Sequence, residues 1–517
     1  MPDTPPWVRD AVFYQIFPDR FAASERVIKP GPLEPWGAPP TNYGFKGGDL
    51  LGVVEHLDHI ESLGVNALYL TPVFQSGSNH RYHTYDYFTV DPLLGGDAAL
   101  RELLDAAHAR GIRVILDGVF NHTGRGFWPF HHVLETGAGS PYRHWFHFDQ
   151  EGLERDRPID AYPLARRRLG VAFDQPHPGE VDTRTGGSKA RLGYEAWWDM
   201  PALPKLNIAE PAVREYVWSV AEHWLRFGID GWRLDVPAEI DDPPFWAEFR
   251  RRCRAVNPEA YLVGEIWHVA PEWVAGDRFD ALMNYPLAEA TIGFVGGRSL
   301  NEPLLRSHHE YGQVTRLDGA GFAARLRQLL AAYAPETTAV QLNLLGSHDT
   351  PRVGSLLGGD QEAMELAVTV QATLPGAPCT YYGDEVGVLG GIDPDSRRAF
   401  PWDASSWNVE LLATVRKAFA LRRAEPALRS DEVHFGATAG SALAFERRAD
   451  GRRLVVALNA SEDAVTLPLT SDDERASDAT VLLATGRART AAPLVTAGDA
   501  GPTIALPPRS GAVLRVA

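Results

Sequence analysis

The sequence predicts an α/β fold, a (β/α)8 barrel with an inserted subdomain after the third strand and a C-terminal antiparallel β-sandwich. Three observations predict it. Eight short runs of β-branched and aromatic residues alternate with helical patterns, a long stretch rich in glycine and proline interrupts them, and short strands follow one another after about residue 425. Such alternation is typical of βα units around a parallel sheet.

The barrel strands are expected where short apolar runs end in polar or charged residues. A run of this kind, bounded by turn residues, is typical of a strand buried in a parallel sheet. The candidate runs are residues 12–16, 67–70, 114–116, 231–234, 261–264, 281–283, 340–345 and 380–382.

Three domains follow from this pattern. We expect the barrel to span residues 1–121 and 205–425. Residues 122–204 form a stretch far longer than an ordinary βα loop, so they predict a small inserted subdomain B. Residues 426–517 alternate in short strands and predict the C-terminal β-sandwich.

Composition and charge restrict the classes of partner. The 517 residues are 44% hydrophobic, which allows a large core and a deep site. A net charge of −17 argues against nucleic acid and anionic membranes as partners, but it is compatible with a neutral oligosaccharide. The chain begins without the pattern of a signal peptide and contains only Cys253 and Cys379, so we expect a cytoplasmic protein. We expect it to be a monomer or a homodimer.

Four of the strand ends carry carboxylates. These are Asp117 in DGVFNH, Asp235 in GWRLD, Glu265 in GEIWH and Asp349 in SHD. A single Asp at a strand end is more often a helix cap than a catalyst. In a (β/α)8 barrel, however, the C-terminal ends of the strands form the reaction site, so four carboxylates on that face indicate catalysis. Cleavage of a glycosidic bond requires such a combination of attacking, proton-donating and charge-stabilising groups.

The same segments resemble the α-amylase family of glycoside hydrolases over nearly the whole chain. DGVFNH, GWRLDV, GEIWH and LLGSHDT occur in the order of that family, and MPALPKLN at residues 200–207 is similar to a marker of its neopullulanase, cyclomaltodextrinase and maltogenic-amylase branch. The resemblance implies hydrolysis of α-glucosidic bonds in short or cyclic maltodextrins with retention of configuration. Transglycosylation is a further activity that the same residues support in relatives.

The resemblance implies a role for each carboxylate. Asp235 corresponds to the nucleophile, Glu265 to the general acid/base, and Asp349 to the group that helps distort the sugar and stabilise the transition state. Arg233 lies two residues before Asp235, so its side chain points to the same side of the strand. We expect this arginine to lower the pKa of Asp235 and keep it ionised, whereas Glu265 must hold a proton at working pH.

A second group of residues is expected to surround the cleaved sugar. By resemblance, His80 and Tyr82 line its subsite, while His122 and His348 donate hydrogen bonds to its hydroxyl groups. A lone histidine is more often structural, and only the motif favours binding for these two. Many relatives carry Asp after the tyrosine where this chain has His83.

Three further residues are expected at the ends of the substrate. Arg397 and Arg398 resemble a segment that contacts its non-reducing side, although a solvated arginine pair is the competing explanation. Trp267 follows Glu265 by two residues, where relatives place an aromatic ring against the leaving sugar. The alternative for Trp267 is packing against the inserted subdomain.

Two departures from the branch are visible. The first barrel strand begins near residue 11, so we expect the N-terminal β-sandwich of many relatives to be absent. The segment after Phe21 is AASER rather than a loop rich in Asn and Asp. Few oxygen ligands remain there for a hard cation, so we expect no required metal or other cofactor, although Asn121 corresponds to a calcium ligand in some relatives.

Two other functions compete with this interpretation. An exo-acting α-glucosidase is the alternative within catalysis, because the shorter N-terminus and the changed loop at His83 alter the cleft. A barrel that has lost activity and only binds carbohydrate is the alternative outside it. Retention of Asp235, Glu265, Asp349 and Arg233 argues against an inactive barrel. The sequence leaves α-1,4 versus α-1,6 preference open.

Overall fold

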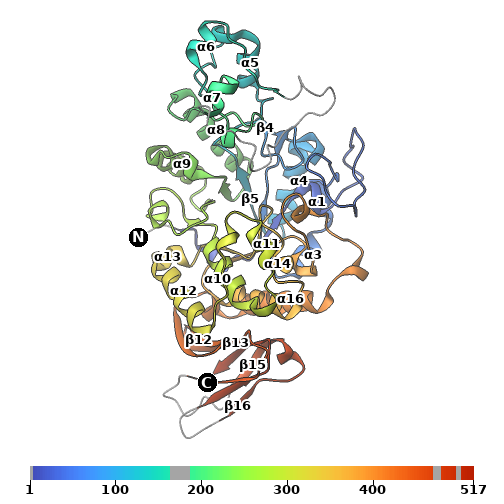
Figure 1. Cartoon of the computed structure of the whole chain (residues 1–517), viewed down its shortest axis with the longest axis vertical. Helices are drawn as coiled ribbons and strands as arrows, with labels where there is room; N and C mark the ends of the chain where they lie inside the picture. The colour runs from blue at the N-terminus through green and yellow to red at the C-terminus, as the bar shows by residue number, and fades with distance from the viewer. Residues whose placement is uncertain (1–3, 164–186, 470–478, 497–501, 517) are drawn as a thin grey trace.

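The computed structural model describes residues 4–163, 187–469, 479–496 and 502–516. Its three parts lie one after another along the longest axis of the molecule (Figure 1). The barrel occupies the middle, and the C-terminal strands lie at one end. At the opposite end is the inserted part, with helices α5 (Trp128–Thr136), α6 (Gln150–Glu154) and α7 (Gly187–Leu192).

Eight parallel strands form the barrel, as the sequence predicts. Their order in the sheet is β8-β7-β6-β5-β2-β1-β10-β9, and a parallel bridge between Met283 and Leu342 joins the two ends of the sheet into a closed barrel. The strands are β1 (Phe13–Ile16), β2 (Ala67–Leu70), β5 (Arg113–Gly118), β6 (Gly231–Leu234), β7 (Tyr261–Gly264), β8 (Ala281–Leu282), β9 (Leu342–Leu344) and β10 (Ala377–Tyr381).

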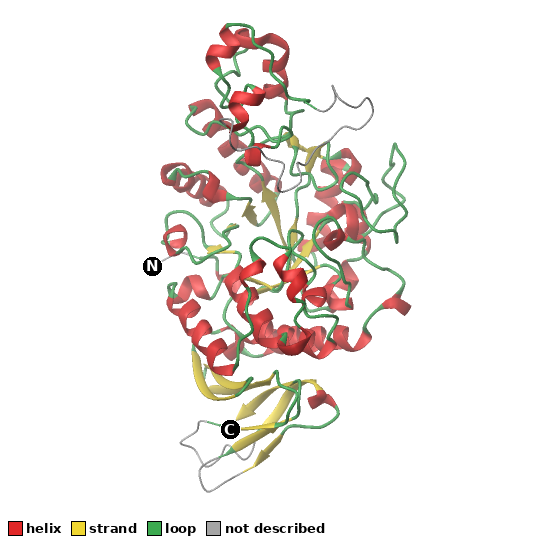
Figure 2. Cartoon of the chain, in the orientation of Figure 1, coloured by secondary structure: helices red, strands yellow, loops and turns green. Residues whose placement is uncertain are grey.

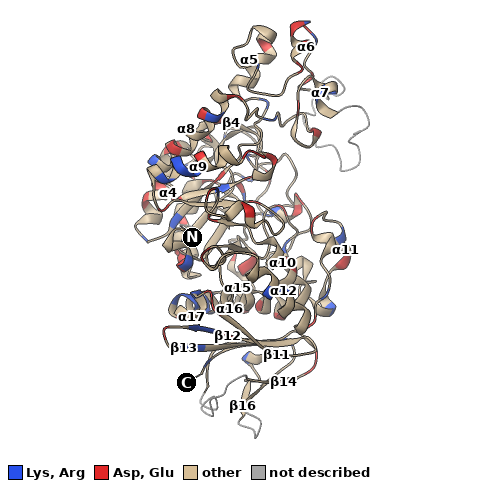
Figure 3. Cartoon of the chain, turned by 90° about the vertical axis from the view of Figure 1, so that its left-hand side faces the viewer, with Lys and Arg blue, Asp and Glu red and all other residues tan. Residues whose placement is uncertain are grey.

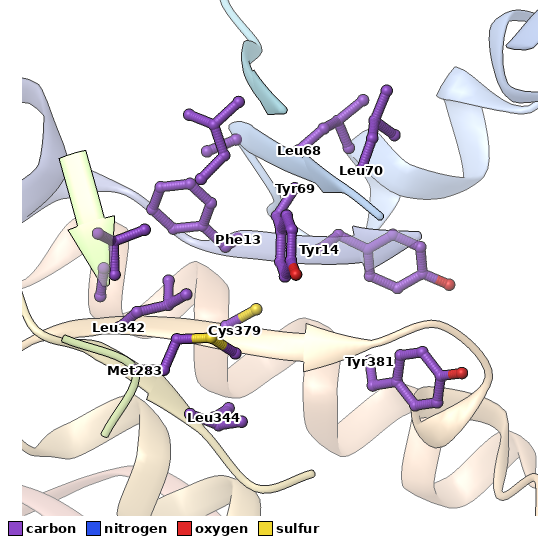
Figure 4. Close-up of a cluster of buried hydrophobic side chains, with 14 of the residues drawn as sticks. Phe13, Tyr14, Leu68, Tyr69, Leu70, Met283, Leu342, Leu344, Cys379 and Tyr381 are labelled. Carbon is purple, nitrogen blue, oxygen red and sulfur yellow. The ribbon is translucent and has the colours of Figure 1, made fainter. Parts of the chain in front are cut away.

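The barrel strands are buried on both faces. Every residue of β1, β2, β6 and β7 is buried, which is why these strands are continuous apolar runs rather than alternating ones. Figure 4 shows part of the core, with Phe13, Tyr69, Leu342 and Cys379 drawn from four of the strands. Because the interior is packed, reacting groups have room only at the strand ends.

Helices surround the strands (Figure 2). Helix α8 shows why they form: Glu210 caps its N-terminus, proline is its first residue, and Gly228 ends it with a φ of 113°. Besides α5 to α7, the helices are α1 (Pro18–Phe21), α2 (Leu50–Glu55), α3 (Leu57–Ser62), α4 (Gly96–His108), α8 (Pro211–Phe227), α9 (Pro243–Val256), α10 (Tyr285–Val295), α11 (Glu302–Arg306), α12 (Gly319–Ala331), α13 (Pro335–Thr338), α14 (Val353–Leu356), α15 (Gln361–Thr373), α16 (Val409–Ala424) and α17 (Pro426–Arg429).

The inserted part has a small aromatic core of its own. Phe130 of α5 packs against Phe146, Phe148 and Tyr194 at ring-centroid distances of 5.0 to 5.4 Å. A bridge between His122 and Lys205 joins its two ends where it leaves the barrel. Residues 164–186 of the predicted subdomain lie outside the described residues, and the domain boundaries stay predictions.

The C-terminal strands form two antiparallel sheets. The five-stranded sheet has the order β11-β12-β13-β18-β15 and the three-stranded sheet has the order β14-β17-β16. The strands are β11 (Val433–Ala439), β12 (Ala442–Ala449), β13 (Arg452–Asn459), β14 (Val465–Pro468), β15 (Thr480–Gly486), β16 (Leu494–Thr496), β17 (Thr503–Leu506) and β18 (Ser510–Val516).

Alternate residues of the five-stranded sheet enter two different cores. Ala444 and Val455 pack with Ile504 of the smaller sheet, which makes the pair of sheets a sandwich. Their neighbours Phe445 and Val456 belong to the large core that also contains the barrel. Because successive side chains of a strand point to opposite faces, this one sheet joins the sandwich to the barrel.

The outer surface carries both signs of charge. Basic and acidic residues are interspersed along α8 and α9 (Figure 3). Among the described residues, no helix is both long and apolar enough to span a membrane.

Candidate active site

Arg233 of β6 lies at the centre of the carboxylates that the sequence singles out. Its Nη1 donates to both oxygens of Asp117, at 2.8 and 3.0 Å, and to Oδ1 of Asp235 at 2.9 Å. Its Nη2 lies 2.9 Å from Oε2 of Glu265. Neighbouring parallel strands β5, β6 and β7 supply these groups, so three strand ends meet on one fully buried guanidinium.

The oxygen atoms of Asp235 and Glu265 differ in their partners. Oδ2 of Asp235 is buried and accepts no hydrogen bond from any described residue. In contrast, Oε2 of Glu265 accepts from the backbone N–H of Val236 at 3.0 Å, and its Oε1 accepts from Nε1 of Trp267 at 3.2 Å. One oxygen of Asp235 is therefore left free to react, while Glu265 is held at both of its oxygens.

A chain of hydrogen bonds connects the far side of the site to Asp117. Nε2 of Gln15 lies 2.9 Å from Nδ1 of His348, and Nε2 of His348 lies 2.6 Å from the Tyr82 hydroxyl. Tyr82 donates to Asp117 at 2.8 Å, as does Tyr69 at 2.9 Å. Because the Gln15 amide nitrogen can only donate, Nδ1 of His348 accepts, which places the imidazole proton on Nε2, facing Tyr82.

Asp349 lies beyond β9 and is the most open of the three predicted catalytic carboxylates, with a side chain that is 32% exposed. Its Oδ2 lies 3.0 Å from Nε2 of His348, and its Oδ1 lies 3.2 Å from Nη2 of Arg397. Arg397 also donates from Nε to the carbonyl of His348 at 2.9 Å and pairs with Asp393 at 3.1 Å. Arg397 is thus fixed beside Asp349.

The pKa values of the carboxyl groups shift in two directions. Burial raises the pKa of both Asp235 and Glu265, and Arg233 lowers both without outweighing it. Arg233 lowers the pKa of Asp235, as expected, but burial and the neighbouring carboxylates raise it by more. The expectation that the pKa of Asp235 is depressed is therefore wrong. Asp349 behaves differently: burial raises its pKa, but His348 and Arg397 outweigh burial and hold the pKa below its usual value.

Three histidines beside the site, His80, His83 and His122, have pKa values below the usual one and are neutral at neutral pH. Burial, and then the charge of His83, lowers the pKa of His122 to about 3. Burial, and then Arg125, lowers the pKa of His83 to about 4. Burial likewise lowers the pKa of His80, whose ring lies 5.8 Å from that of Tyr82. Neutral imidazoles can both donate to and accept from uncharged hydroxyl groups.

Among the described residues, the ring contacts of Trp267 are with Tyr285, His308 and Tyr311, none of which belongs to the inserted part. Its contact with Tyr285 is the closest of the three. The two rings are stacked with centroids 3.6 Å apart and an interplanar angle of 9°. One face of the indole is thereby covered, and its N–H points at Glu265.

Arg398 is the one predicted binding residue that the structure does not bring to this cluster. Its guanidinium pairs with Asp395 at 2.8 Å and is 46% exposed. No contact of Arg398 with the three predicted catalytic carboxylates is found within the part of the chain that the structure describes.

Three residues of this network were not singled out by sequence reasoning. They are Gln15, which orients His348, Tyr69, which binds Asp117, and Tyr285, which stacks on Trp267. Gln15 had a signal, since a glutamine in an otherwise apolar strand needs a buried partner. The two tyrosines had none, because tyrosine is common both in buried strands such as β2, which contains Tyr69, and in buried helices such as α10, which begins at Tyr285.

Comparison with known proteins places this site in a family. Residues 15–438 match the α-amylase catalytic domain. The chain is 40% identical to a cyclomaltodextrinase of Geobacillus thermopakistaniensis (strain MAS1), over 90% of this chain and 72% of that protein. The crystal structure of Ttha1563 from Thermus thermophilus is 46% identical, with a TM-score of 0.87 and coverage of 99% of this chain and 100% of that one.

A cyclic α-maltosyl-(1→6)-maltose hydrolase of Arthrobacter globiformis is also similar. It is 36% identical, with a TM-score of 0.80, and the match covers 99% of this chain and 100% of the other. The carboxylates converge at the ends of barrel strands in the order typical of one family, and the family match spans more than three quarters of the chain. The chain therefore belongs to the α-amylase family and is a glycoside hydrolase.

Proposed function

We propose that the protein hydrolyses α-glucosidic bonds in short or cyclic maltodextrins with retention of anomeric configuration. One observation carries the mechanism: Asp235 and Glu265 are held by neighbouring nitrogens of the same guanidinium. Retaining glycosidases hold their two carboxyl groups about 5 Å apart, whereas inverting enzymes separate them by about 6.5 to 9.5 Å to admit a water. Two carboxyls bridged by one guanidinium favour the shorter separation.

The first step is a displacement at the anomeric carbon. The unpartnered Oδ2 of Asp235 attacks that carbon and forms a glycosyl ester, while Glu265 gives its proton to the glycosidic oxygen as the bond to the leaving sugar breaks. In the second step Glu265, now ionised, takes a proton from water. The resulting hydroxide oxygen attacks the anomeric carbon, the ester breaks, and the product keeps the α configuration.

The pKa values suit a pair of groups that share one proton. Burial raises the pKa of both carboxyls, and the charge of Glu265 raises the pKa of Asp235 further, so the ionised form of both groups together is unfavourable. Activity is expected to fall at low pH, where Asp235 is protonated, and at high pH, where Glu265 is ionised. Asp349 stays charged, and it is proposed to stabilise the positive charge that develops on the sugar ring.

The remaining predicted residues are proposed to bind the substrate. His80 and His122 offer neutral imidazoles to the hydroxyl groups of the cleaved sugar, and His348 is proposed to donate a hydrogen bond to one of them. Tyr82 and His348 present parallel rings 5.3 Å apart, and Tyr82 is proposed to lie against the sugar face.

Arg397 is proposed to orient Asp349, to which it is bound. Arg398 is proposed to contact only the non-reducing end of longer substrates. Trp267 is proposed to lie beside the leaving sugar, where its N–H also holds Glu265 in position.

The choice of maltodextrins rests on the relatives. A cyclomaltodextrinase and a hydrolase of a cyclic maltosyl-maltose are both similar over nearly the whole chain. Product analysis on maltotriose, pullulan and cyclodextrins tests this choice. Opening of a cyclodextrin is expected. Release of glucose from chain ends alone, with cyclodextrins left intact, would contradict it and favour the exo-acting α-glucosidase.

Metal independence is proposed as well. Among the described residues no group of three or more His, Cys, Asp or Glu side chains is arranged to hold a metal ion. Asn121, the position of a calcium ligand in some relatives, has its amide 3.3 Å from Nδ1 of His122. Activity is expected to survive dialysis against a chelator. A loss that added calcium restores would contradict the proposal.

A cytoplasmic monomer or homodimer is the proposed form of the protein. The two buried, unpaired cysteines and the similarity to an intracellular maltogenic amylase of Bacillus subtilis support a reducing compartment. Light scattering of the purified chain tests the oligomeric state, and an assembly larger than a dimer would contradict it.

A further inference from the structure

Three aromatic rings form a continuous stack that begins inside the site. His122, just beyond β5, lies parallel to Trp197, with centroids 4.8 Å apart and an interplanar angle of 6°. Trp197 in turn stacks on Trp198 at 4.8 Å and 21°. His122 is fully buried, whereas Trp198 is 60% exposed, so the stack runs from the buried site to the surface.

The backbone at Trp198 is held in an uncommon conformation. Trp198 has a φ of 50° and Asp199 has a φ of 55°, a region that bulky side chains rarely adopt. The neighbouring structure holds them there, because Asp199 accepts from the backbone N–H of Ser188 at 2.8 Å and from Arg191 at 2.9 Å. Strain of this kind that exposes a large apolar ring favours a role in binding over a role in packing.

A second aromatic series also reaches Trp198. Trp267, whose N–H contacts Glu265, lies 5.9 Å from the ring of His308. His308 stacks on His309 at 5.0 Å, and His309 and Trp198 make a T-shaped contact with centroids 6.0 Å apart. The rings from the inserted part and those from the segment after α11 therefore form one arc that leads away from Glu265.

We propose that Trp198 is a binding residue for a glucose unit of the leaving oligosaccharide, one unit or more beyond the unit next to the broken bond. This inference rests on the proposed function, in which Glu265 protonates the leaving side. The exposed indole face offers the flat apolar surface on which a sugar ring stacks. Nε1 of Trp197, in the ring that stacks on Trp198, is buried and has no hydrogen-bond partner among the described residues.

The test compares substrates of different length on three variants of the full chain. Trp198→Ala removes the surface, and Trp198→Phe keeps a smaller ring. Trp128→Ala is the matched control, because Trp128 is 61% exposed on α5 of the same inserted part and contacts only the edge of His132 among the described rings. The substrates are maltotriose, maltohexaose, β-cyclodextrin and an aryl α-glucoside, and kcat/KM is measured for each.

Loss of one stacking surface is expected to lower kcat/KM of Trp198→Ala on maltohexaose and β-cyclodextrin about tenfold. The aryl α-glucoside, whose leaving group ends before Trp198, is expected to be cleaved as by the unmodified protein, and Trp198→Phe is expected to recover most of the loss. The main cleavage site in maltohexaose labelled at its reducing end is expected to move, which a purely structural residue would not cause.

Equal losses on all four substrates, or losses no larger than those of Trp128→Ala, would overturn the proposal. An unmodified protein that cleaved none of the maltodextrins would instead overturn the proposed function. The affinity for maltohexaose, measured by calorimetry, would then test the role of Trp198 separately. Equal affinities of the unmodified protein and of Trp198→Ala would overturn that role.

Discussion

Asp235 accepts a hydrogen bond from Arg233 on one oxygen only: Oδ1 lies 2.9 Å from Nη1, and Oδ2 is buried without a partner among the described residues. A buried carboxylate oxygen that accepts no hydrogen bond lowers the stability of the folded protein, so a purely structural role rarely explains such an atom. The proposed attack of this oxygen on the anomeric carbon gives that cost a function.

Asp235→Asn is expected to abolish turnover while the protein stays folded. The amide is nearly isosteric, but it is a poor nucleophile, so kcat should fall by several orders of magnitude. Steady-state kinetics on maltotriose, with the melting temperature as a control, measure the loss. Activity within tenfold of the unmodified protein would contradict the assignment of the nucleophile.

Glu265→Gln is expected to affect substrates according to their leaving groups. An aryl leaving group departs without protonation, whereas the alcohol of a natural maltodextrin needs it. Formation of the glycosyl ester from an aryl α-glucoside should therefore be much less impaired than cleavage of maltotriose. Pre-steady-state release of the phenol measures the first step, and equal losses on both substrates would assign the proton donor to another residue.

Trp267→Phe is expected to shift the pH profile. The indole N–H donates to Oε1 of Glu265 at 3.2 Å, which stabilises the charged carboxylate and lowers its pKa. Phenylalanine keeps the stack on Tyr285 but removes this donor, so the pKa of Glu265 should rise. Because the acid must be protonated, the alkaline limb of kcat/KM should move to higher pH. An unmoved limb would show that the N–H does not act on Glu265.

Arg447→Met is expected to destabilise the contact between the barrel and the C-terminal strands. Arg447 of β12 is buried and donates to the carbonyl of Glu432 at 3.0 Å, and to those of Thr373 and Ser430. Each buried carbonyl left without its donor costs about 1–3 kcal/mol, so the melting temperature should fall by several degrees.

Arg448→Met is the matched control for Arg447→Met. The side chain of Arg448 is 48% exposed and pairs with Glu446 at 2.7 Å. Glu446 is buried, but it also pairs with Arg453 and so keeps a cationic partner when Arg448 is replaced. Equal melting temperatures of the two variants would contradict a role of Arg447 in joining the domains.

The barrel could be predicted because its signal is local. The run 231–234 is strand β6 without change, and the run 114–116 lies inside the longer β5 (Arg113–Gly118). Apolar composition and strand-end carboxylates are properties of short segments, and the order of strands follows from the alternation with helices. The hairpin of β3 (Phe74–Ser76) and β4 (Thr84–Val90) was not predicted, because its residues are neither uniformly apolar nor strictly alternating.

The site residues could be predicted from the sequence only where a single motif contains them. Asp235, Glu265 and Asp349 follow strand ends, and the structure brings them together as the motifs imply. The stack of His122 on Trp197, however, depends on a partner outside the motif that suggested the role of His122. Asp395, the partner of Arg398, lies in the same segment, but the segment alone does not show that Arg398 pairs with it instead of reaching the site. The pKa of Asp235 could not be predicted from Arg233 alone either, because burial is a property of the folded chain.

Trapping of the covalent intermediate tests the central claim most directly. Glu265→Gln is incubated with a fluorinated α-glucosyl fluoride, whose good leaving group allows the ester to form while the fluorine and the missing base slow its hydrolysis. Peptide mapping by mass spectrometry then locates the added mass. We expect it on the peptide that contains Asp235. An adduct on another residue, or the direct release of a β-configured product with no adduct, would contradict double displacement at Asp235.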